Sequence, residues 1–325
     1  MSGRETPAAC PDCGGANLRD MGGIPPANIF AGRKLVAPFL QSALFRCEDC
    51  ALMFRYPTMS EAEMWRRYEQ GEPENWQAPT DTRMDWRLIL ARLEQLRPFS
   101  RVLDFGCYDG AFLQRIGALY PDVELLGVEA NSAAAGRARD AGIQMAGNDF
   151  AALSALPHNV DVVLALDVIE HSISPLRALS CMSDMLASGG HVFVATGTTD
   201  AWTWRGCGSR YWYCHLAEHV GFISEQWAQR AAPRLGLEFK GMTRYSHLDG
   251  ATTVQQKLYE TVTNLCYRVS PGLFAALRRR GLGGIDARAE PELAAAPPYW
   301  LTARDHALFE FRKVAPRPDM AGVED

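Results

Sequence analysis

Short apolar runs alternate with amphipathic stretches from residue 101 onward, and this alternation restricts the fold more than any other feature of the sequence. Strands that read as nearly continuous apolar segments are typical of a parallel sheet covered by helices on both faces. The intervening stretches have helical or turn character, and residues 175–186 form the clearest helical pattern. We therefore expect an α/β fold. Five such runs occur, at residues 101–105, 124–129, 143–146, 160–166 and 190–195.

Two further strands are predicted at residues 237–245 and 303–314, separated by a helical insertion within about 250–295. We assign residues 98–315 to this main domain and expect residues 316–325 to be a disordered tail. Apolar residues recur at helical spacing in the insertion, which predicts ordinary amphipathic packing, with a homodimer or membrane-surface face as the alternative. These residues are Val254, Leu258, Val262, Leu265 and Val269.

Two C-x-x-C pairs near the start of the chain predict a metal site. Each pair places two thiolates on a tight turn, and two pairs supply the four sulfurs of a tetrahedral structural zinc site. We therefore predict a small zinc-ribbon-like module at residues 1–58. The predicted ligands are Cys10, Cys13, Cys47 and Cys50.

Charge and composition restrict the partners of the protein. Residues 1–57 contain six basic and five acidic residues, and the whole chain of 325 residues has a net charge of −5, so we expect no nucleic-acid partner. No apolar run approaches the roughly 18 residues of a membrane span, and the first residues lack the pattern of a signal peptide. We expect a cytoplasmic protein.

Residues 59–97 have the spacing of two helices that bridge the module and the main domain. Ser60 is the predicted N-cap of the first helix, with Glu63 three residues later. The second predicted helix, at residues 83–97, stops before Pro98.

The turn after the first predicted strand carries Gly106 and Gly110 and leads into a helix. The glycines are four residues apart without a third, and Asp109 within the turn repels phosphate, so a dinucleotide-binding loop is disfavoured. Glu129 follows the next strand, where a carboxylate accepts hydrogen bonds from ribose hydroxyls. With Asp104 beside it, the pocket suits an adenosyl ligand that carries positive charge.

The next segment extends this adenosyl pocket. Asp149 is placed to hold the adenine amino group, with Phe150 against the ring.

This series of motifs resembles the class I S-adenosylmethionine-dependent methyltransferases over about residues 99–314. The resemblance implies S-adenosylmethionine as cofactor and a Rossmann-like seven-stranded sheet whose last two strands form an antiparallel hairpin. Tyr108 stands where most members carry a glycine, so the loop must tolerate a side chain there. The implied cofactor-binding residues are Asp104, Gly106, Tyr108, Gly110, Glu129, Ala130, Asn131, Asp149, Phe150 and Asp167.

The cysteine pairs, the stretch at residues 23–30 and the pair Glu218–His219 look like those of the nucleotide-sugar C-methyltransferases. That resemblance implies that the Glu-His pair supplies the base and sugar contacts, and that His171 lines the same pocket. The chain departs from this family by ending before the C-terminal domain and by carrying Leu216 in place of a tyrosine.

Methyl transfer requires an aligned acceptor and removal of its proton, and histidine is the natural base near neutral pH. We predict His219 as the base, with His215, or a packing role without any side-chain base, as the alternatives. Glu218 orients an imidazole or binds a substrate hydroxyl. Asp167, Glu170 and His171 form a D-x-x-E-H pattern. It fits either a second, Mg²⁺-binding site or, as we favour, a helix cap at Asp167 with His171 facing the acceptor or packing.

The sequence thus predicts a methyltransferase that acts on a sugar or sugar-like small molecule by direct displacement. Whether carbon or oxygen attacks is left open. The alternatives are an O-methyltransferase of a secondary metabolite, an RNA or protein methyltransferase, and a binding protein without catalytic activity.

Overall fold

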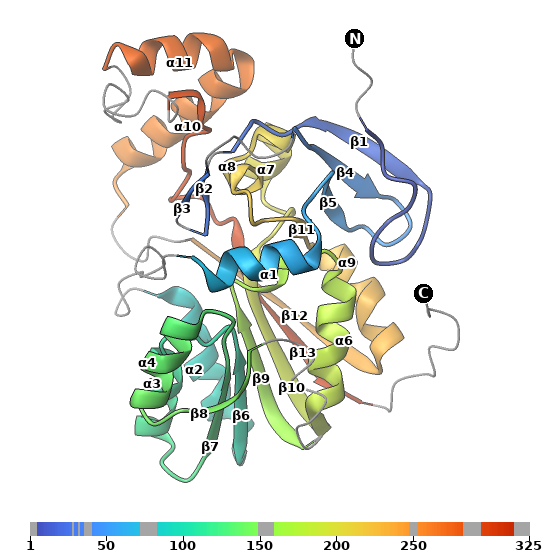
Figure 1. Ribbon diagram of the computed structural model, residues 1–325, viewed down its shortest axis with the longest axis vertical. Helices are drawn as coiled ribbons and strands as arrows, with labels where there is room; N and C mark the ends of the chain where they lie inside the picture. The colour runs from blue at the N-terminus through green and yellow to red at the C-terminus, as the bar shows by residue number, and fades with distance from the viewer. Residues whose placement is uncertain are drawn as a thin grey trace.

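The computed structural model describes residues 5–27, 29–31, 33–35, 41–71, 83–148, 159–246, 252–281 and 294–314. A seven-stranded sheet lies at its centre, in the order β12-β13-β10-β9-β6-β7-β8 (Figure 1). Its strands are β6 (Arg101–Phe105), β7 (Glu124–Val128), β8 (Gln144–Gly147), β9 (Val160–Leu166), β10 (Leu186–Gly197), β12 (Leu237–Tyr245) and β13 (His306–Lys313).

The sheet confirms the predicted α/β class. Strands β6 to β10 pair in parallel, whereas β13 runs antiparallel to both of its neighbours, β10 and β12. The predicted strands are all present, but β10 begins at Leu186 rather than near residue 190. It continues through two glycines and a shift of register before His191, and glycine carries no apolar signal.

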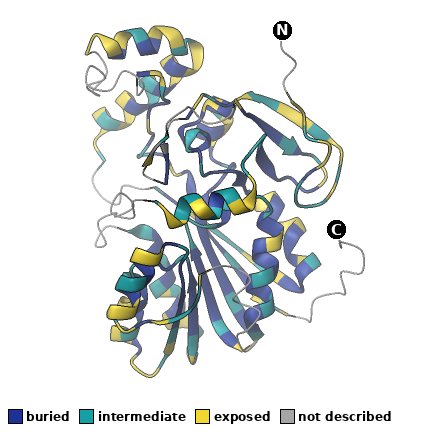
Figure 2. Ribbon diagram, in the orientation of Figure 1, coloured by how far each residue is buried: buried dark blue, intermediate teal, exposed yellow. Residues whose placement is uncertain are grey.

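Helices cover both faces of this sheet. Successive strand residues point to opposite sides, and because the central strands are nearly continuous apolar runs, both faces must be buried. Val102 packs in the layer of α2 (Met84–Leu96) and α3 (Ala111–Leu119), with α4 (Ser132–Asp140) beside them. Leu103 packs in the opposite layer, with α6 (Pro175–Met185) and α9 (Glu225–Ala231) (Figures 1 and 2). Two helices predicted from sequence, at residues 83–97 and 175–186, correspond to α2 and α6.

The N-terminal strands form a separate sheet that a segment of the main domain completes. Its order is β1-β4-β5-β11, and Gly221 and Phe222 of β11 pair antiparallel with β5. The sheet therefore crosses the domain boundary that we predict at residue 58. The strands are β1 (Leu18–Gly23), β4 (Ala43–Cys47), β5 (Met53–Tyr56) and β11 (Gly221–Phe222), and a small pair, β2 (Ile29–Phe30) with β3 (Arg33–Lys34), lies beside them.

Helix α1 (Glu61–Glu69) lies across the carboxyl end of the large sheet (Figure 1). Its predicted cap is confirmed, since the Ser60 hydroxyl accepts a hydrogen bond from the backbone N–H of Glu63. At its other end, the Asn131 amide donates to the carbonyls of Tyr68 and Glu69. The backbone N–H of Gly71 also donates to the Tyr68 carbonyl, so Asn131 adds side-chain bonds that hold the end of α1 over the sheet.

The remaining elements follow β9, β10 and β12 in the chain. They are α7 (Trp202–Cys207), α8 (Trp212–His215), α10 (Val254–Val269) and α11 (Pro271–Arg279), together with the short turns η3 (Ile169–His171), η4 (Gly208–Arg210) and η5 (Ala232–Leu235). Among the described residues, no helix has the length and apolar character needed to cross a bilayer. The predicted tail at residues 316–325 lies outside the described residues.

Candidate active site

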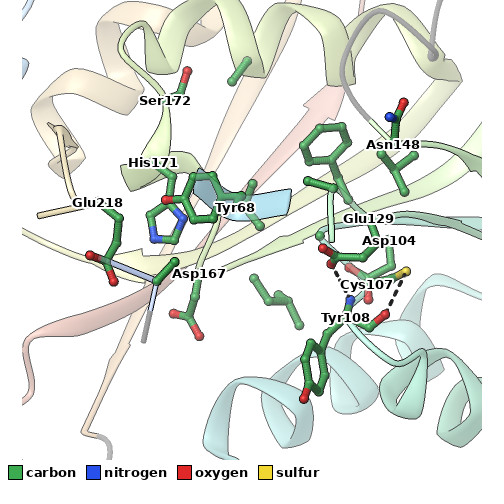
Figure 3. Close-up of a pocket in the computed structure, with 18 of the residues that line it drawn as sticks. Tyr68, Asp104, Cys107, Tyr108, Glu129, Asn148, Asp167, His171, Ser172 and Glu218 are labelled. Carbon is green, nitrogen blue, oxygen red and sulfur yellow. Dashed lines mark hydrogen bonds between the residues drawn. The ribbon is translucent and has the colours of Figure 1, made fainter. Parts of the chain in front are cut away.

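A cavity of about 840 Å³ lies between the carboxyl ends of β6, β7 and β9 and the inner side of α1. The labelled side chains in Figure 3 form two groups. One group surrounds the turn after β6, with Asp104, Tyr108 and Glu129. The other includes His171 and Glu218, so cofactor-like and acceptor-like groups share one cavity.

The turn after β6 has a left-handed backbone at Gly106, Tyr108 and Gly110. A Cβ atom on Gly106 would lie 2.5 Å from a methyl carbon of Val168, so a side chain there is excluded. Tyr108, with φ of 52°, adopts a conformation that favours glycine. Its ring contacts Arg137, whose guanidinium carbon lies 5.3 Å from the ring centroid.

Glu129 is held by two backbone amides. Its Oε1 accepts from the N–H of Asn131 at 2.7 Å, and its Oε2 accepts from the N–H of Tyr108 at 2.9 Å. Burial raises the pKa of this carboxyl, while both amides oppose that shift. The two bonds leave lone pairs on both oxygens for the hydroxyls of a bound ribose.

Asp104 is a buried carboxylate with an unpaired oxygen. Its Oδ1 receives no hydrogen bond from any residue that the structure describes. Burial raises the pKa of Asp104 to about 7, although Arg83 opposes the shift. A buried acceptor without a donor costs about 1–3 kcal/mol, which a cationic ligand group would offset. The site therefore fits the ammonium group of S-adenosylmethionine.

The other predicted cofactor residues lie in different places. Ala130 and Asp167 line the cavity, but the Asp167 Oδ2 lies 2.9 Å from the guanidinium of Arg83. Asn131 is not among the lining residues; its Oδ1 accepts from the N–H of Ala134 and so caps α4, while its amide holds α1. The predicted adenine contacts, Asp149 and Phe150, lie outside the described residues.

His219 has a defined tautomer. Its Nδ1 lies 3.0 Å from the carbonyl oxygen of Tyr213, and a carbonyl only accepts, so Nδ1 carries the proton. The lone pair is therefore on Nε2. Burial, together with neighbouring His171, lowers the pKa of His219 well below its ordinary value. The side chain is neutral at pH 7 and lines the cavity.

His171 forms a second neutral imidazole beside His219. The two ring centroids are 5.1 Å apart, and the His171 ring also stacks on Tyr68 of α1 at 5.3 Å. Burial lowers the pKa of His171 to about 4. Tyr68 was not predicted as a site residue, because its helical spacing is equally typical of core packing.

The residues of the D-x-x-E-H pattern lie in two places: Glu170 and His171 cluster with His219, whereas Asp167 pairs with Arg83. Glu170, His171 and His219 each offer an atom within 4.8 Å of the others. Both oxygens of Glu170 already accept hydrogen bonds, from the hydroxyls of Tyr213 at 2.6 Å and Thr196 at 2.8 Å. Asp167 lies outside this cluster.

The predicted helix cap at Asp167 is wrong. The N-cap of η3 is Val168, and no side chain bonds there. Asp167 instead pairs with Arg83, the N-cap residue of α2, and residues next to Asp167 in the sequence give no indication of this partner.

Glu218 and His215 flank this region differently. Glu218 lines the cavity, and its buried Oε2 has no hydrogen-bond partner among the described residues. Burial raises its pKa. His215 is not among the lining residues, and its Nδ1 lies 3.4 Å from the carbonyl oxygen of Pro25. The geometry therefore places Glu218, rather than His215, beside His219 at the cavity.

Arg55 of β5 holds the segment that carries His219. Its buried guanidinium donates to the carbonyls of His219 at 3.1 Å, Leu216 at 2.8 Å and Cys214. In the sequence it counts only as one basic residue of the N-terminal module. The sequence did contain one indication of a buried role for Arg55, because it lies between two aromatic residues, Phe54 and Tyr56.

We expect Arg55→Met to lower kcat by about tenfold or more, because His219 loses the donors that fix its backbone. Cofactor affinity should change less than about twofold, since Asp104 and Glu129 are untouched. Arg55→Lys should recover part of the activity. Arg46→Met, on neighbouring β4, is the control. An equal loss of kcat and cofactor affinity would show that Arg55 only stabilises the fold.

The four predicted cysteines converge on one point. The Sγ atoms of Cys10 and Cys50 are 3.5 Å apart, as are those of Cys13 and Cys47, and all four lie within 4.8 Å. Four thiolates around zinc, each at about 2.3 Å, would have sulfurs separated by about 3.8 Å. The geometry therefore fits a tetrahedral ion.

The first cysteine knuckle is attached to the main domain through Asp12. Its Oδ1 accepts from the Ser174 hydroxyl at 2.8 Å and from the N–H of Leu176. Its Oδ2 accepts from the indole of Trp227 at 2.7 Å. The knuckle thus packs on the start of α6 and on α9.

A parallel sheet with an antiparallel last strand, and carboxylates at the ends of its first two strands, define a class I S-adenosylmethionine-dependent methyltransferase domain. Comparison with known families agrees: residues 79–239 match the family model described as a methyltransferase domain. The chain therefore contains a methyltransferase domain.

Individual relatives are distant. A ubiquinone biosynthesis O-methyltransferase from Parvibaculum lavamentivorans is 33% identical over 107 residues, which cover 31% of this chain and 42% of that protein. The match thus spans less than half of the relative. Among solved structures, the [4+2]-cyclase SpnF is 15% identical with a TM-score of 0.45, covering 72% of this chain and 81% of that one. The plantazolicin methyltransferase BpumL with SAH is 15% identical with a TM-score of 0.42, covering 71% and 82%.

Proposed function

We propose that the chain transfers a methyl group from S-adenosylmethionine to a hydroxyl of a sugar-like small molecule. The observation that carries this proposal is the pairing of two acceptors in the cavity wall. The Glu218 Oε2 has no partner among the described residues, and the neighbouring His219 has its lone pair on Nε2. A molecule with several hydroxyls supplies donors to both.

The cofactor, when bound, supplies an electrophilic methyl group on a sulfonium. Asp104 would bind its ammonium group and Glu129 its ribose hydroxyls. His219 would accept the proton of the reacting hydroxyl at Nε2, and Glu218 would accept a hydrogen bond from a neighbouring hydroxyl. Helix α1 closes the cavity and limits the access of water to the reacting groups.

A phenolic acceptor is the second candidate. Trp65 and Tyr68 of α1 line the same cavity and offer aromatic faces. The relative named for ubiquinone biosynthesis is an O-methyltransferase.

S-adenosylhomocysteine release against nucleotide-linked sugars and dihydroxybenzenes, with product masses recorded, separates the two candidates. We expect a gain of one methyl on sugars. Methylation of dihydroxybenzenes alone would replace the sugar proposal with the phenolic one, and failure of the folded chain to bind the cofactor would overturn both.

We expect cofactor affinity to rise with pH through about 7, the pKa of Asp104. Only the ionised carboxylate attracts the cofactor ammonium, so the affinity should fall by up to about tenfold for each pH unit below 7. Asp104→Asn should bind weakly and without this dependence. Calorimetry at several pH values, with exposed Asp122→Asn as control, measures it. A pH-independent affinity of the unmodified protein would contradict the assignment.

We also propose that the cysteine cluster holds a structural zinc ion. The convergence of four sulfurs, at separations close to those of a tetrahedral thiolate site, supports it.

A further inference from the structure

Helices α10 and α11 expose several large apolar side chains to solvent. Both helices project from the rest of the chain, at the upper left of Figure 1, and Figure 2 shows extensive exposure along them. The large aliphatic side chains exposed on them are Val254, Leu258, Val262, Leu265, Val269, Leu273 and Leu277, and Tyr259 of α10 is also exposed. Val254 is 82% exposed, Leu258 63%, Val269 83% and Leu273 62%.

We call these seven aliphatic residues the apolar stripe. The part of the stripe on α10 is not the face by which that helix packs on the protein. The packed face carries Glu260, which accepts from the N–H and hydroxyl of Thr302, and Tyr267, whose hydroxyl donates to the carbonyl of Ala295. At about 100° per residue, the five apolar residues of α10 fall within about 80° of arc on the side away from these anchors. The helix is therefore apolar on a face that packing on the described residues does not require.

The same two helices carry exposed cations, and exposed acids are absent from them. Lys257, Arg268, Arg279 and Arg280 are exposed. The one acidic residue between positions 254 and 281 is Glu260, which is buried. This segment is positive in a chain whose net charge is −5. Apolar residues flanked by Lys and Arg are typical of helices that lie in a membrane interface.

We propose that α10 and α11 form a docking surface for an anionic lipid bilayer. The leucines and valines enter the headgroup boundary, and the four exposed cations contact lipid phosphates. A second copy of the chain suits this surface less well, because a two-fold interface places the same patch against itself and brings like charges together. The proposal does not depend on the proposed reaction.

Sedimentation of the full chain with lipid vesicles tests the proposal. At about 0.15 M salt, we expect at least about tenfold stronger binding to phosphatidylcholine vesicles that contain phosphatidylglycerol than to phosphatidylcholine alone. Leu258→Glu with Leu273→Glu should lower that binding by about tenfold or more. Arg268→Gln with Arg279→Gln, which leaves the apolar stripe intact, should also lower it and reduce its salt dependence.

Leu119→Glu is the matched control, because Leu119 is 53% exposed on α3, outside the stripe. It should bind the vesicles like the unmodified chain. Equal sedimentation of the unmodified chain with both vesicle types would overturn the proposal. So would a lipid-free dimer in analytical ultracentrifugation that Leu258→Glu with Leu273→Glu converts to a monomer, since the surface would then be a contact between copies.

Discussion

Replacing Cys47 with serine will lower the melting temperature of the whole chain by about 10 °C or more. Cys47 is fully buried, and its Sγ lies 3.5 Å from that of Cys13. Structural zinc in small modules contributes apparent binding free energies of about 10–16 kcal/mol, as large as the total stability of many proteins. In a chain of this size, about 1 kcal/mol shifts the melting temperature by about 2 °C.

The loss should extend beyond the cysteine module. Strand β5 pairs with β11 of the main domain, and Arg55 of β5 holds the carbonyls around His219. When the module loses its order, the segment that carries the proposed base loses two of its attachments. We therefore expect activity to fall at temperatures where the large sheet is still folded.

Circular dichroism melts and metal analysis of protein purified without chelator measure this effect. Cys266→Ser is the control, because Cys266 is an exposed cysteine on α10 outside the cluster. It should keep the melting temperature within about 1 °C. Zinc far below one equivalent in the unmodified protein, with the same melting temperature after Cys47→Ser, would show that the cluster holds no structural ion.

The fold was predictable because its signals are local. Each strand of the parallel sheet is a short apolar run, and such a run can be recognised from consecutive residues alone. The proposed cofactor half of the cavity follows from the same pattern, since Asp104 and Glu129 stand at adjacent strand ends. Parallel strands bring those ends to one edge of the sheet.

The contacts that complete the cavity were not predictable, because they join distant segments. Arg55 reaches a carbonyl 164 residues away, and Asp167 pairs with Arg83 across 84 residues. Asn131 was predicted to contact the cofactor because it follows the strand end. In the structure its amide holds the end of α1, and nothing in its neighbouring residues indicates that partner.

His219→Ala will lower kcat by about 10²- to 10⁴-fold, the range typical of losing a general base. The imidazole is neutral at pH 7 because its pKa is lowered, and the Tyr213 carbonyl fixes the proton on Nδ1. Its Nε2 is therefore available as a base without prior deprotonation. Since protonation occurs only well below the ordinary pKa, kcat at saturating cofactor should stay level between about pH 6 and 8.

The controls separate catalysis from packing, because His219 is buried beside Tyr213 and His171. His219→Gln retains a side chain of similar length without a basic nitrogen, so it should fold and still lose activity. Both variants should bind S-adenosylhomocysteine with an affinity within about twofold of the unmodified protein, because the cofactor groups lie on the other side of the cavity. His215→Ala should keep most of the activity, since His215 is not among the cavity residues. Full turnover by folded His219→Gln would transfer the role of base to His171, whose neutral imidazole lines the same cavity.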